Sequence, residues 1–253
     1  MYVVGIVSAL KSEASCLMNL RFPVLKVANI DRHARLCLSS MGDNAAQLAS
    51  ESLLELGVEA LASFGVAAAL DKKLIPGDLV LAEKIIDVGA EQESLPTTLA
   101  WRNRLEQMLS PKLTIVGGSI AKSTIPLTTA QSKLELAEAT GACAADMESA
   151  AIARIAARVG VPFIAIRAIV DPLEFSPPEA LLSAVYPEGS VDVLRLTSLI
   201  FNRSVKIKTL AHLGLGMYSA RTTLKKVVQV AGKKLASDPD DSERYDPSEY
   251  AEH

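Results

Sequence analysis

Four acidic residues in this chain stand next to the ends of apolar segments. Asp146 and Glu148 precede an alanine-rich run, and Asp171 follows the next apolar run directly. Glu13 comes shortly after the apolar start of the chain. Two carboxyl groups can share acid and base work when their surroundings hold their pKa values apart. We therefore interpret these residues as parts of one acid–base site; the alternative is that each is a solvated charge at a helix start or in a loop.

The segments beside these acids have the patterns of buried strands and of an amphipathic helix. Two runs are almost continuously apolar, as strands of a parallel sheet are when helices cover both faces: "YVVGIVSAL" (2–10) and "FIAIRAIV" (163–170). The segment 147–159 places two isoleucines and a valine on one helical face. The acids are therefore expected in the turns between strands and helices.

Strands and helices alternate along the rest of the chain. The expected helices cover 43–57 and 128–141, and the expected strands cover 58–70, 77–89 and 112–121. Asp43 and Asn44 are capping candidates for the first helix, and Gly57 and Gly141 end the two helices. This alternation predicts a single α/β domain with a mostly parallel mixed sheet flanked by helices.

A parallel sheet also predicts where a site forms. Ligands of open α/β sheets bind beyond the carboxyl ends of the strands. Glu13, Gly65 and Asp171 each lie near or just after the end of an expected strand. We therefore expect these three segments to meet at one edge of the sheet.

Composition limits the class of protein. Of the 253 residues, 49% are hydrophobic and 22% are charged, which excludes a disordered chain and favours one large domain. The formal net charge of −3 and the absence of a long basic run argue against nucleic acid as the main ligand.

Cysteine use and hydropathy bear on cofactors and location. Cys16, Cys37 and Cys143 form no paired motif, so neither a disulfide framework nor a zinc site is indicated, and no metal or cofactor is expected. No apolar run reaches the ~18 residues of a spanning helix. The N-terminus lacks a signal-peptide pattern, so a cytoplasmic protein is expected.

Three stretches together carry a resemblance to a known family. A similarity to the purine nucleoside phosphorylase and uridine phosphorylase superfamily runs, in order, through "VGIVSALKSEASCLM" (4–18), "SFGVAAALDKKLIPGDLVLAEKIIDVGA" (63–90) and "ADMESAAIARIAARVGVPFIAIRAIVD" (145–171). Within the superfamily, the stretches resemble the 5′-methylthioadenosine/S-adenosylhomocysteine nucleosidases. The resemblance implies a nucleoside phosphorylase-like fold and cleavage of an N-glycosidic bond.

Later parts of the chain resemble a narrower group. The segments 128–149 and 192–228 are similar to the hopanoid-associated members of the superfamily, which are thought to remove adenine from adenosylhopane. This resemblance implies one nucleoside phosphorylase-like domain over 1–235, with a helical C-terminal extension over about 180–235. The acidic, proline-containing stretch 236–253 is expected to be a disordered tail.

The resemblance implies two catalytic residues. Glu13 matches the residue that activates the attacking water, and Asp171 matches the residue that delivers a proton to N7 of the departing purine. Glu13 must be ionised to take a proton from water. Asp171 follows a buried strand, where desolvation would raise its pKa and keep it protonated.

Five further residues are implied to bind the substrate. Met147 and Glu148 match the pair beneath the ribose, where the glutamate accepts hydrogen bonds from the 2′- and 3′-hydroxyls. The helix dipole is expected to favour the Glu148 anion. Ile125 falls near the base-stacking position, and Gly65 and Val66 belong to the ribose-side loop.

Departures from the family pattern keep further functions open. The chain has "GVAAAL" (65–70) where the family has "GSAGGL", so Val66 replaces a serine and two alanines replace glycines. Lost glycines restrict the approach of a ligand to the backbone, which keeps a non-catalytic nucleoside binder as an alternative. The turn 9–15 carries Glu13 and no arginine, which favours water over phosphate. A phosphate-dependent phosphorylase and a methylthioadenosine nucleosidase also stay open.

The expected partner is a small nucleoside, lipid-linked if the hopanoid resemblance holds. Superfamily members commonly pair, so a homodimer is expected. The basic and apolar segment 206–226 leaves a peripheral membrane contact open beside ordinary helix packing. The extra apolar residues after position 180 predict an open groove that leads from the ribose site towards the region between Leu181 and Tyr218. The alternative is that these residues only complete the core or a dimer contact.

Overall fold

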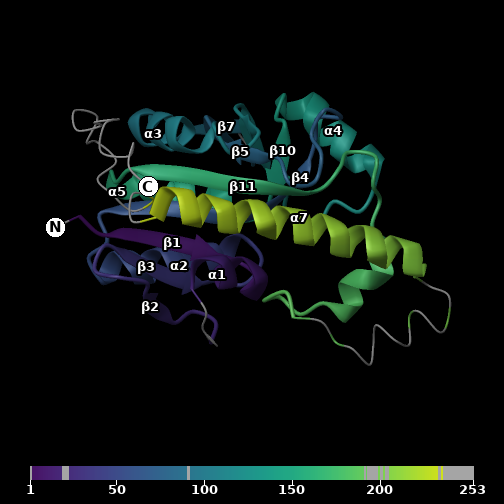
Figure 1. Ribbon diagram of the computed structural model, residues 1–253, viewed down its shortest axis with the longest axis horizontal. Helices are drawn as coiled ribbons and strands as arrows, with labels where there is room; N and C mark the ends of the chain where they lie inside the picture. Colours follow the sequence, from purple (N-terminus) through teal and green to yellow (C-terminus); the bar gives the residue numbers. More distant parts are fainter. Residues whose placement is uncertain are drawn as a thin grey trace.

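Eleven strands of the described chain form one sheet, with helices on both faces (Figure 1). The computed structural model describes residues 2–18, 23–89, 92–190 and 205–232, with the single positions 192, 199, 202 and 235. The strands are β1 (Val4–Ser8), β2 (Val27–Asn29), β3 (Ala34–Leu38), β4 (Ala60–Ala69), β5 (Leu79–Leu81), β6 (Lys84–Val88), β7 (Gln92–Pro96), β8 (Ile115–Val116), β9 (Ser119–Lys122), β10 (Ala144–Asp146) and β11 (Phe163–Asp171). The helices are α1 (Lys11–Leu17), α2 (Asp43–Glu55), α3 (Leu99–Leu109), α4 (Ala130–Thr140), α5 (Ser149–Val159), the 3₁₀ helix η1 (Glu179–Ala184) and α7 (Ile207–Ala231).

The long strand β4 changes partners along its length. The sheet order is β2-β3-β1-β4-β10-β9-β6-β7, and β11 pairs with both β4 and β5. β4 runs parallel to β1 as far as Ser63, whereas Ala68 and Ala69 pair with antiparallel β10. The chain leaves β1 at Ser8 and turns into α1 beside the middle of β4. This change of partner places Glu13 next to Val66.

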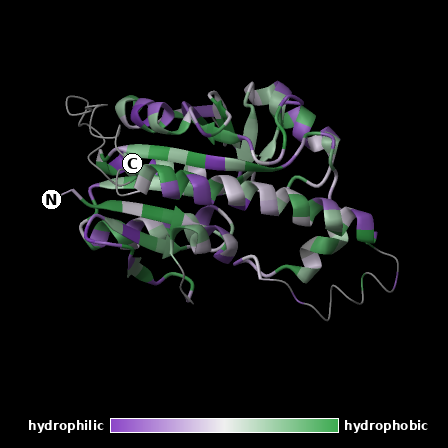
Figure 2. Cartoon of the chain, viewed as in Figure 1, coloured by the Kyte–Doolittle hydropathy of each residue, from purple (hydrophilic) through white to green (hydrophobic). Residues whose placement is uncertain are grey.

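Two apolar cores lie on the two faces of the sheet. α2 and α5 pack together on one face, where Leu53 and Ile152 are fully buried. α1, α3 and α7 cover the other face, where Trp101 and Leu224 are fully buried. Figure 2 shows hydrophobic residues concentrated in the strands between these layers. The alternating apolar runs thus form a sheet that is covered on both sides, as buried parallel strands require.

The predicted fold class, a single α/β domain with a mixed sheet flanked by helices, is confirmed. Two predicted strands were wrong in extent. The run 77–89 divides into β5 and β6, and the run 112–121 divides into β8 and β9, because each run changes partners within it. The two breaks lie against each other, where Glu83 N donates to Gly118 O at 2.8 Å and Gly118 has a φ of +120°.

α2 begins at Asp43 as predicted but has a different cap, and α5 begins later than predicted. Gly42 is the N-cap of α2, and neither Asp43 nor Asn44 caps it; the Asp43 carboxylate instead pairs with Arg154 Nη2 at 2.6 Å. The helix expected from Met147 begins at Ser149, with Glu148 as its N-cap. At α2 the predicted cap residue Asp43 is engaged in a tertiary ion pair, whereas at α5 the nearby Asp146 Oδ1 accepts a hydrogen bond from Ser149 N at 2.9 Å.

The C-terminal part is described only in pieces. α7 packs its buried residues into the core of the α1 and α3 face, whereas the predicted tail, 236–253, lies outside the described residues. One domain over 1–235 stays a prediction. Within the parts of the chain that the structure describes, no helix has the length and apolar character to cross a membrane.

Candidate active site

A cavity of about 220 Å³ lies at the carboxyl ends of β1, β9, β10 and β11. Six of the predicted site residues line it: Glu13, Val66, Ile125, Met147, Glu148 and Asp171. Segments far apart in the sequence therefore meet at one edge of the sheet, where the parallel strands end. Gly65 is absent from the described lining.

Glu13 lies in the first turn of α1 with its carboxylate directed towards the backbone of β4 and of the preceding turn. Oε2 accepts hydrogen bonds from Leu10 N at 2.9 Å and Ala9 N at 3.1 Å, and Oε1 accepts one from Val66 N at 2.8 Å. Burial raises the pKa of Glu13, and Arg167 and the three backbone donors act against that rise. The backbone holds the carboxylate in one orientation at the cavity wall.

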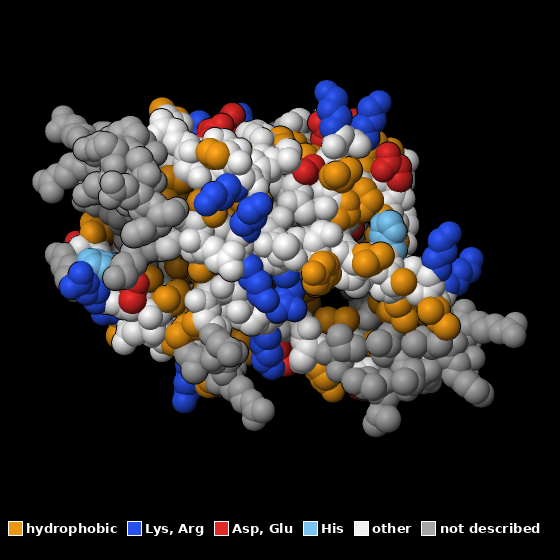
Figure 3. Space-filling model, in the orientation of Figure 1, with side chains coloured by type: hydrophobic (Ala, Val, Ile, Leu, Met, Phe, Trp, Pro, Cys, Tyr) orange, Lys and Arg blue, Asp and Glu red, His pale blue; other side chains and the backbone are white. Residues whose placement is uncertain are grey.

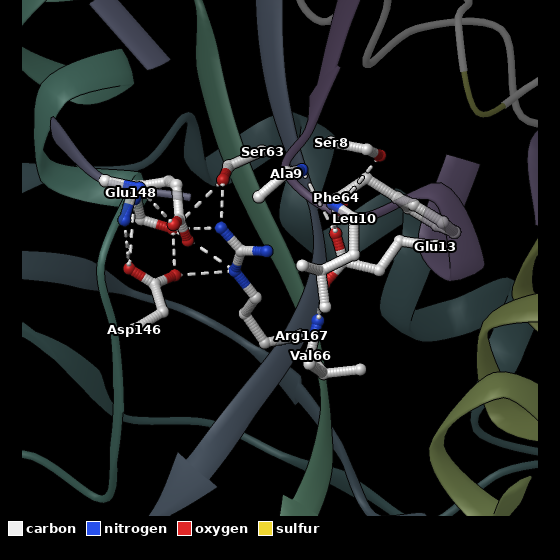
Figure 4. A network of polar contacts seen from close by, with 12 residues as sticks. Ser8, Ala9, Leu10, Glu13, Ser63, Phe64, Val66, Asp146, Glu148 and Arg167 are labelled. Atoms are coloured by element: carbon white, nitrogen blue, oxygen red, sulfur yellow. Dashed lines mark hydrogen bonds and ion pairs between the residues drawn. The ribbon is translucent and has the colours of Figure 1, made fainter. Parts of the chain in front are cut away.

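The cation that acts on Glu13 is Arg167, a residue that the sequence pattern did not single out. It lies in the middle of β11 and is 1% exposed. Its Nε donates to Asp146 Oδ2 at 2.6 Å, and its Nη2 donates to Ser63 Oγ at 2.6 Å and to Ser149 Oγ at 3.1 Å. Figure 4 shows the guanidinium with Asp146 and Ser63 on one side and Glu13 on the other. A lone arginine within an apolar strand is the signal that could have found it, because a buried charge needs a partner.

Gly65 admits both charged side chains. A Cβ at this position would overlap Arg167 Nη1 and Glu13 Oε1. The space over the glycine is therefore filled by the two side chains. Gly65 thus has a structural role in the close approach of Arg167 and Glu13, and its contact with the substrate stays a prediction.

Glu148 stands at the N-cap of α5, and its Oε1 accepts a hydrogen bond from Gly42 N at 2.8 Å. Burial, followed by the Asp146 carboxylate, raises the pKa of Glu148 to about 7, against the opposite effect of Arg167. The expectation that the helix dipole favours the Glu148 anion is therefore opposed by burial, because the residue is only 7% exposed.

Asp171 ends β11 at another part of the cavity, where a buried lysine holds it. Lys133 lies in α4, and its Nζ donates to Asp171 Oδ2. Burial raises the pKa of Asp171, and the charges of Lys133 and His212 act in the opposite direction. The upward direction is the one expected from sequence. The lysine was missed, because a lysine in the first turn of a helix is typical of an exposed position.

The rest of the wall is mostly apolar, and part of it comes from α7. Ile125 and Met147 line the cavity together with Leu10 and Met41, and Leu213 extends the wall from α7. Figure 3 shows a hollow beside α7 with hydrophobic side chains around it. Apolar walls with a few convergent polar groups are typical of small-molecule sites.

A family model relates this site to known proteins. The model described as "Phosphorylase superfamily" matches residues 28–186, which carry most of the cavity wall. The chain belongs to the phosphorylase superfamily.

Solved structures similar to this superfamily member include a futalosine hydrolase and two nucleosidases. Futalosine hydrolase of Helicobacter pylori is 18% identical with a TM-score of 0.64, over 90% of this chain and 97% of that chain. The 5′-methylthioadenosine/S-adenosylhomocysteine nucleosidase of Helicobacter pylori is 18% identical with a TM-score of 0.64, over 90% and 98%. The nucleosidase of the same name from Neisseria meningitidis is 18% identical with a TM-score of 0.68, over 93% and 100%. At these identities the similarity establishes a shared fold.

In this member of the phosphorylase superfamily, the expected ribose-side loop is the end of a strand. β4 continues through Ala69, and Ala68 and Ala69 pair with Ala145 and Ala144 of β10. Alanine weakens a strand less than glycine does. Val66 contributes its backbone N–H to Glu13 at this point, so the replacement of a serine here leaves the held carboxylate intact.

Proposed function

We propose that this chain is a purine nucleosidase, which breaks an N-glycosidic bond with water and releases adenine. The observation that carries the proposal is a pair of buried carboxyl groups, Glu13 and Asp171, on the wall of one cavity. Cleavage builds positive charge on the sugar and negative charge on the departing base. A general base near the sugar and a general acid near the purine therefore both help.

At the proposed sugar end, Glu13 takes a proton from water. Its two oxygens are oriented by three backbone donors, and Arg167 stabilises the anion from beside Gly65. Glu148 accepts hydrogen bonds from the ribose hydroxyls, which favour its ionised form over the neutral form that burial favours. Met147 packs beneath the sugar.

At the proposed base end, Asp171 protonates N7 of the purine. A buried carboxyl whose pKa is raised can hold a proton at a pH where an exposed aspartic acid has lost it. Ile125 lies on the same cavity wall and is proposed to stack on the base. Protonation of the leaving group makes the bond easier to break, by ~10²–10⁴-fold in typical enzymes.

The charge of the wall supports water over phosphate as the nucleophile. The described lining contains four acidic residues, Glu13, Asp146, Glu148 and Asp171. It contains no Lys, Arg or His. Arg167 already donates to Asp146 and to two serines. A phosphate anion would therefore meet negative charge without a dedicated cation. A phosphate-dependent phosphorylase is the less favoured alternative.

The 5′-substituent is proposed to be large and apolar, with adenosylhopane as the preferred substrate. The resemblance of 192–228 to the hopanoid-associated members supports this choice, and Leu213 brings α7 to the cavity wall. A small thioether, as in methylthioadenosine, is the alternative. The groove towards the region between Leu181 and Tyr218 stays a prediction.

A lipid-linked substrate would bring the protein to a membrane surface. α7 exposes Ile207, Leu215 and Tyr218 to solvent, and Lys206 and Lys208 flank its start. Exposed apolar and basic side chains on one helix support peripheral contact with an anionic bilayer. Flotation with vesicles that contain or lack anionic lipid tests this contact, and sedimentation equilibrium tests the expected homodimer.

An adenine-release assay tests the proposed function. Adenosine, methylthioadenosine and adenosylhopane are compared with and without phosphate. Release without phosphate, fastest with adenosylhopane, is the expected result. A strict phosphate requirement with a sugar 1-phosphate product would overturn hydrolysis. Preference for methylthioadenosine would favour the small-substrate alternative, and binding without release would favour a non-catalytic binder.

A further inference from the structure

Lys133 is fully buried and has an acceptor for each of its ammonium hydrogens. Nζ donates to Asp171 Oδ2, to Pro172 O at 2.8 Å and to Phe175 O at 3.0 Å. Its exposed fraction is 0%. Lysine is almost never fully buried unless it is paired. The three acceptors all belong to the end of β11 and the turn that follows, so one ammonium group holds the whole segment that carries Asp171.

The pairing decides which oxygen of Asp171 can carry a proton. An ammonium group has three donors and no acceptor. Oδ2 accepts from Lys133, and the positive charge beside it favours Oδ1 as the oxygen that carries a proton. Oδ1 has no hydrogen-bond donor among the residues that the structure describes, and Asp171 lines the cavity. The acidic O–H is thus available to a ligand.

We propose that Lys133 is a positioning residue for leaving-group protonation, acting through Asp171; the proposal rests on the proposed function. In the step, the Oδ1–H bond of Asp171 breaks and an N–H bond forms at N7, while the electrons of the C1′–N9 bond pass to the base. Water adds its OH to C1′ and gives its proton to Glu13. Solvent then returns one proton from Glu13 to Asp171. Lys133 keeps its three protons and stabilises the carboxylate that Asp171 becomes.

Two groups act on Asp171 electrostatically besides burial: Lys133 from α4 and His212 from α7. His212 also stacks on Phe175, with ring centroids 4.4 Å apart. Burial raises the pKa of Asp171 and Lys133 lowers it, so loss of the lysine charge must raise that pKa further. The protonated acid is present below its pKa and is lost as the pH rises through it. Without Lys133, the alkaline fall in turnover should therefore move to higher pH.

The first arm of the experiment compares pH–rate profiles of the wild type, Lys133→Met and Lys112→Met. Lys112 is an exposed lysine after α3 and serves as the matched control. Lys133→Met should lower kcat for adenine release ~10²-fold, because a misplaced catalytic group costs about that much, and should shift the alkaline limb upward. Lys133→Arg, which retains the charge, should keep the limb near its original pH. The control should match the wild type.

A second substrate separates positioning from folding. A riboside with a nitrophenolate leaving group departs without protonation, so Lys133→Met should leave its hydrolysis within a few fold of the wild type. An equal loss on both substrates, or an unmoved alkaline limb, would show that Lys133 only holds the structure together.

A carboxyl ¹³C NMR titration makes the proposal independent of turnover. The Asp171 signal is assigned with Asp171→Asn, and its pKa is compared in the wild type and Lys133→Met. An upward shift supports the proposal, and an unchanged pKa overturns it. If the wild type releases no base from any nucleoside, the proposed function fails, whereas this titration still decides whether Lys133 tunes Asp171.

Discussion

The cavity has a buried cation near each of its two proposed catalytic acids, and the two cations are used differently. Arg167 distributes its donors over Asp146, Ser63 and Ser149, while Glu13 is held by backbone N–H groups. Lys133 instead donates directly to Asp171 and to two backbone carbonyls. Arg167 therefore pairs with Asp146, which is neither of the two proposed catalytic acids, whereas Lys133 pairs with the proposed acid itself.

The difference follows from the shapes of the two cations. The planar guanidinium presents donors in several fixed directions and can hold an acid and two hydroxyls together, whereas the ammonium is a compact point charge. At the sugar end, Arg167 stabilises Glu13 by its charge without a hydrogen bond to either Glu13 oxygen. At the base end, Lys133 donates to one oxygen of Asp171 and leaves the other oxygen available. Two carboxyl groups of similar burial thus receive different proposed tasks from their partners.

The largest effect is expected from a substitution that removes Arg167, the cation at the sugar end. Arg167→Met should lower the free energy of unfolding by ~3–5 kcal/mol, because Asp146 would remain buried without its partner. Urea unfolding of the wild type and variant measures this loss. The double variant Arg167→Met/Asp146→Asn should regain part of it, since no orphaned charge remains. Strictly additive losses would show that the pair is not coupled.

A side chain added at Gly65, beside Arg167 and Glu13, should affect turnover more than stability. In Gly65→Ala, the new Cβ would collide with Arg167 Nη1 and Glu13 Oε1 and displace both groups. Turnover should fall ~10²-fold, the cost of a displacement of about 1 Å in a catalytic group. Gly214→Ala is the matched control, because its added Cβ meets no atom within 4 Å apart from its chain neighbours and the nearby backbone of its own helix. Normal turnover in Gly65→Ala would mean that the two side chains need not stay close.

The pH dependence of stability tests the burial of Glu148. The pKa of Glu148 is raised from 4.5 to about 7 in the folded chain. Below pH 4.5 both states hold the proton; as the pH rises towards 7, the unfolded chain releases it first, so the free energy of unfolding falls. In Glu148→Gln the free energy of unfolding should fall by ~1–3 kcal/mol less over this pH range, because glutamine does not titrate. Unfolding curves of both proteins at pH 4, 5.5 and 7.5 measure it, and parallel pH profiles would contradict the raised pKa.

The smallest expected effect concerns the helix that carries Lys133. Thr129 caps α4, and its Oγ1 accepts a hydrogen bond from Ser132 N at 3.0 Å. Thr129→Ala should lower the free energy of unfolding by ~1 kcal/mol and leave the pH–rate profile in place, because Lys133 keeps its buried contacts. Thermal unfolding and the adenine-release profile provide the two measurements. A shifted alkaline limb would show that the cap, as well as Lys133, controls Asp171.

The amino-acid sequence predicted the layers of the fold and the edge of the sheet where the site lies. Continuous apolar runs alternating with helical patterns determine a covered, mostly parallel sheet, because such runs must be buried on both faces. Glu13 and Asp171 could be assigned to one edge because the carboxyl ends of parallel strands meet there. Boundaries were harder to predict, since the division of 77–89 into two strands depends on which neighbours each half pairs with.

The charged partners were decided by the tertiary structure alone. Lys133 is 38 positions before Asp171, and Arg167 is 21 positions after Asp146. No local period links either pair. The position of Glu148 likewise predicted an anion favoured by the helix dipole, but burial by distant segments raises its pKa to about 7. Local pattern determines which segments are buried, whereas the electrostatics of each buried acid depend on which distant charges and backbone donors the fold brings to it.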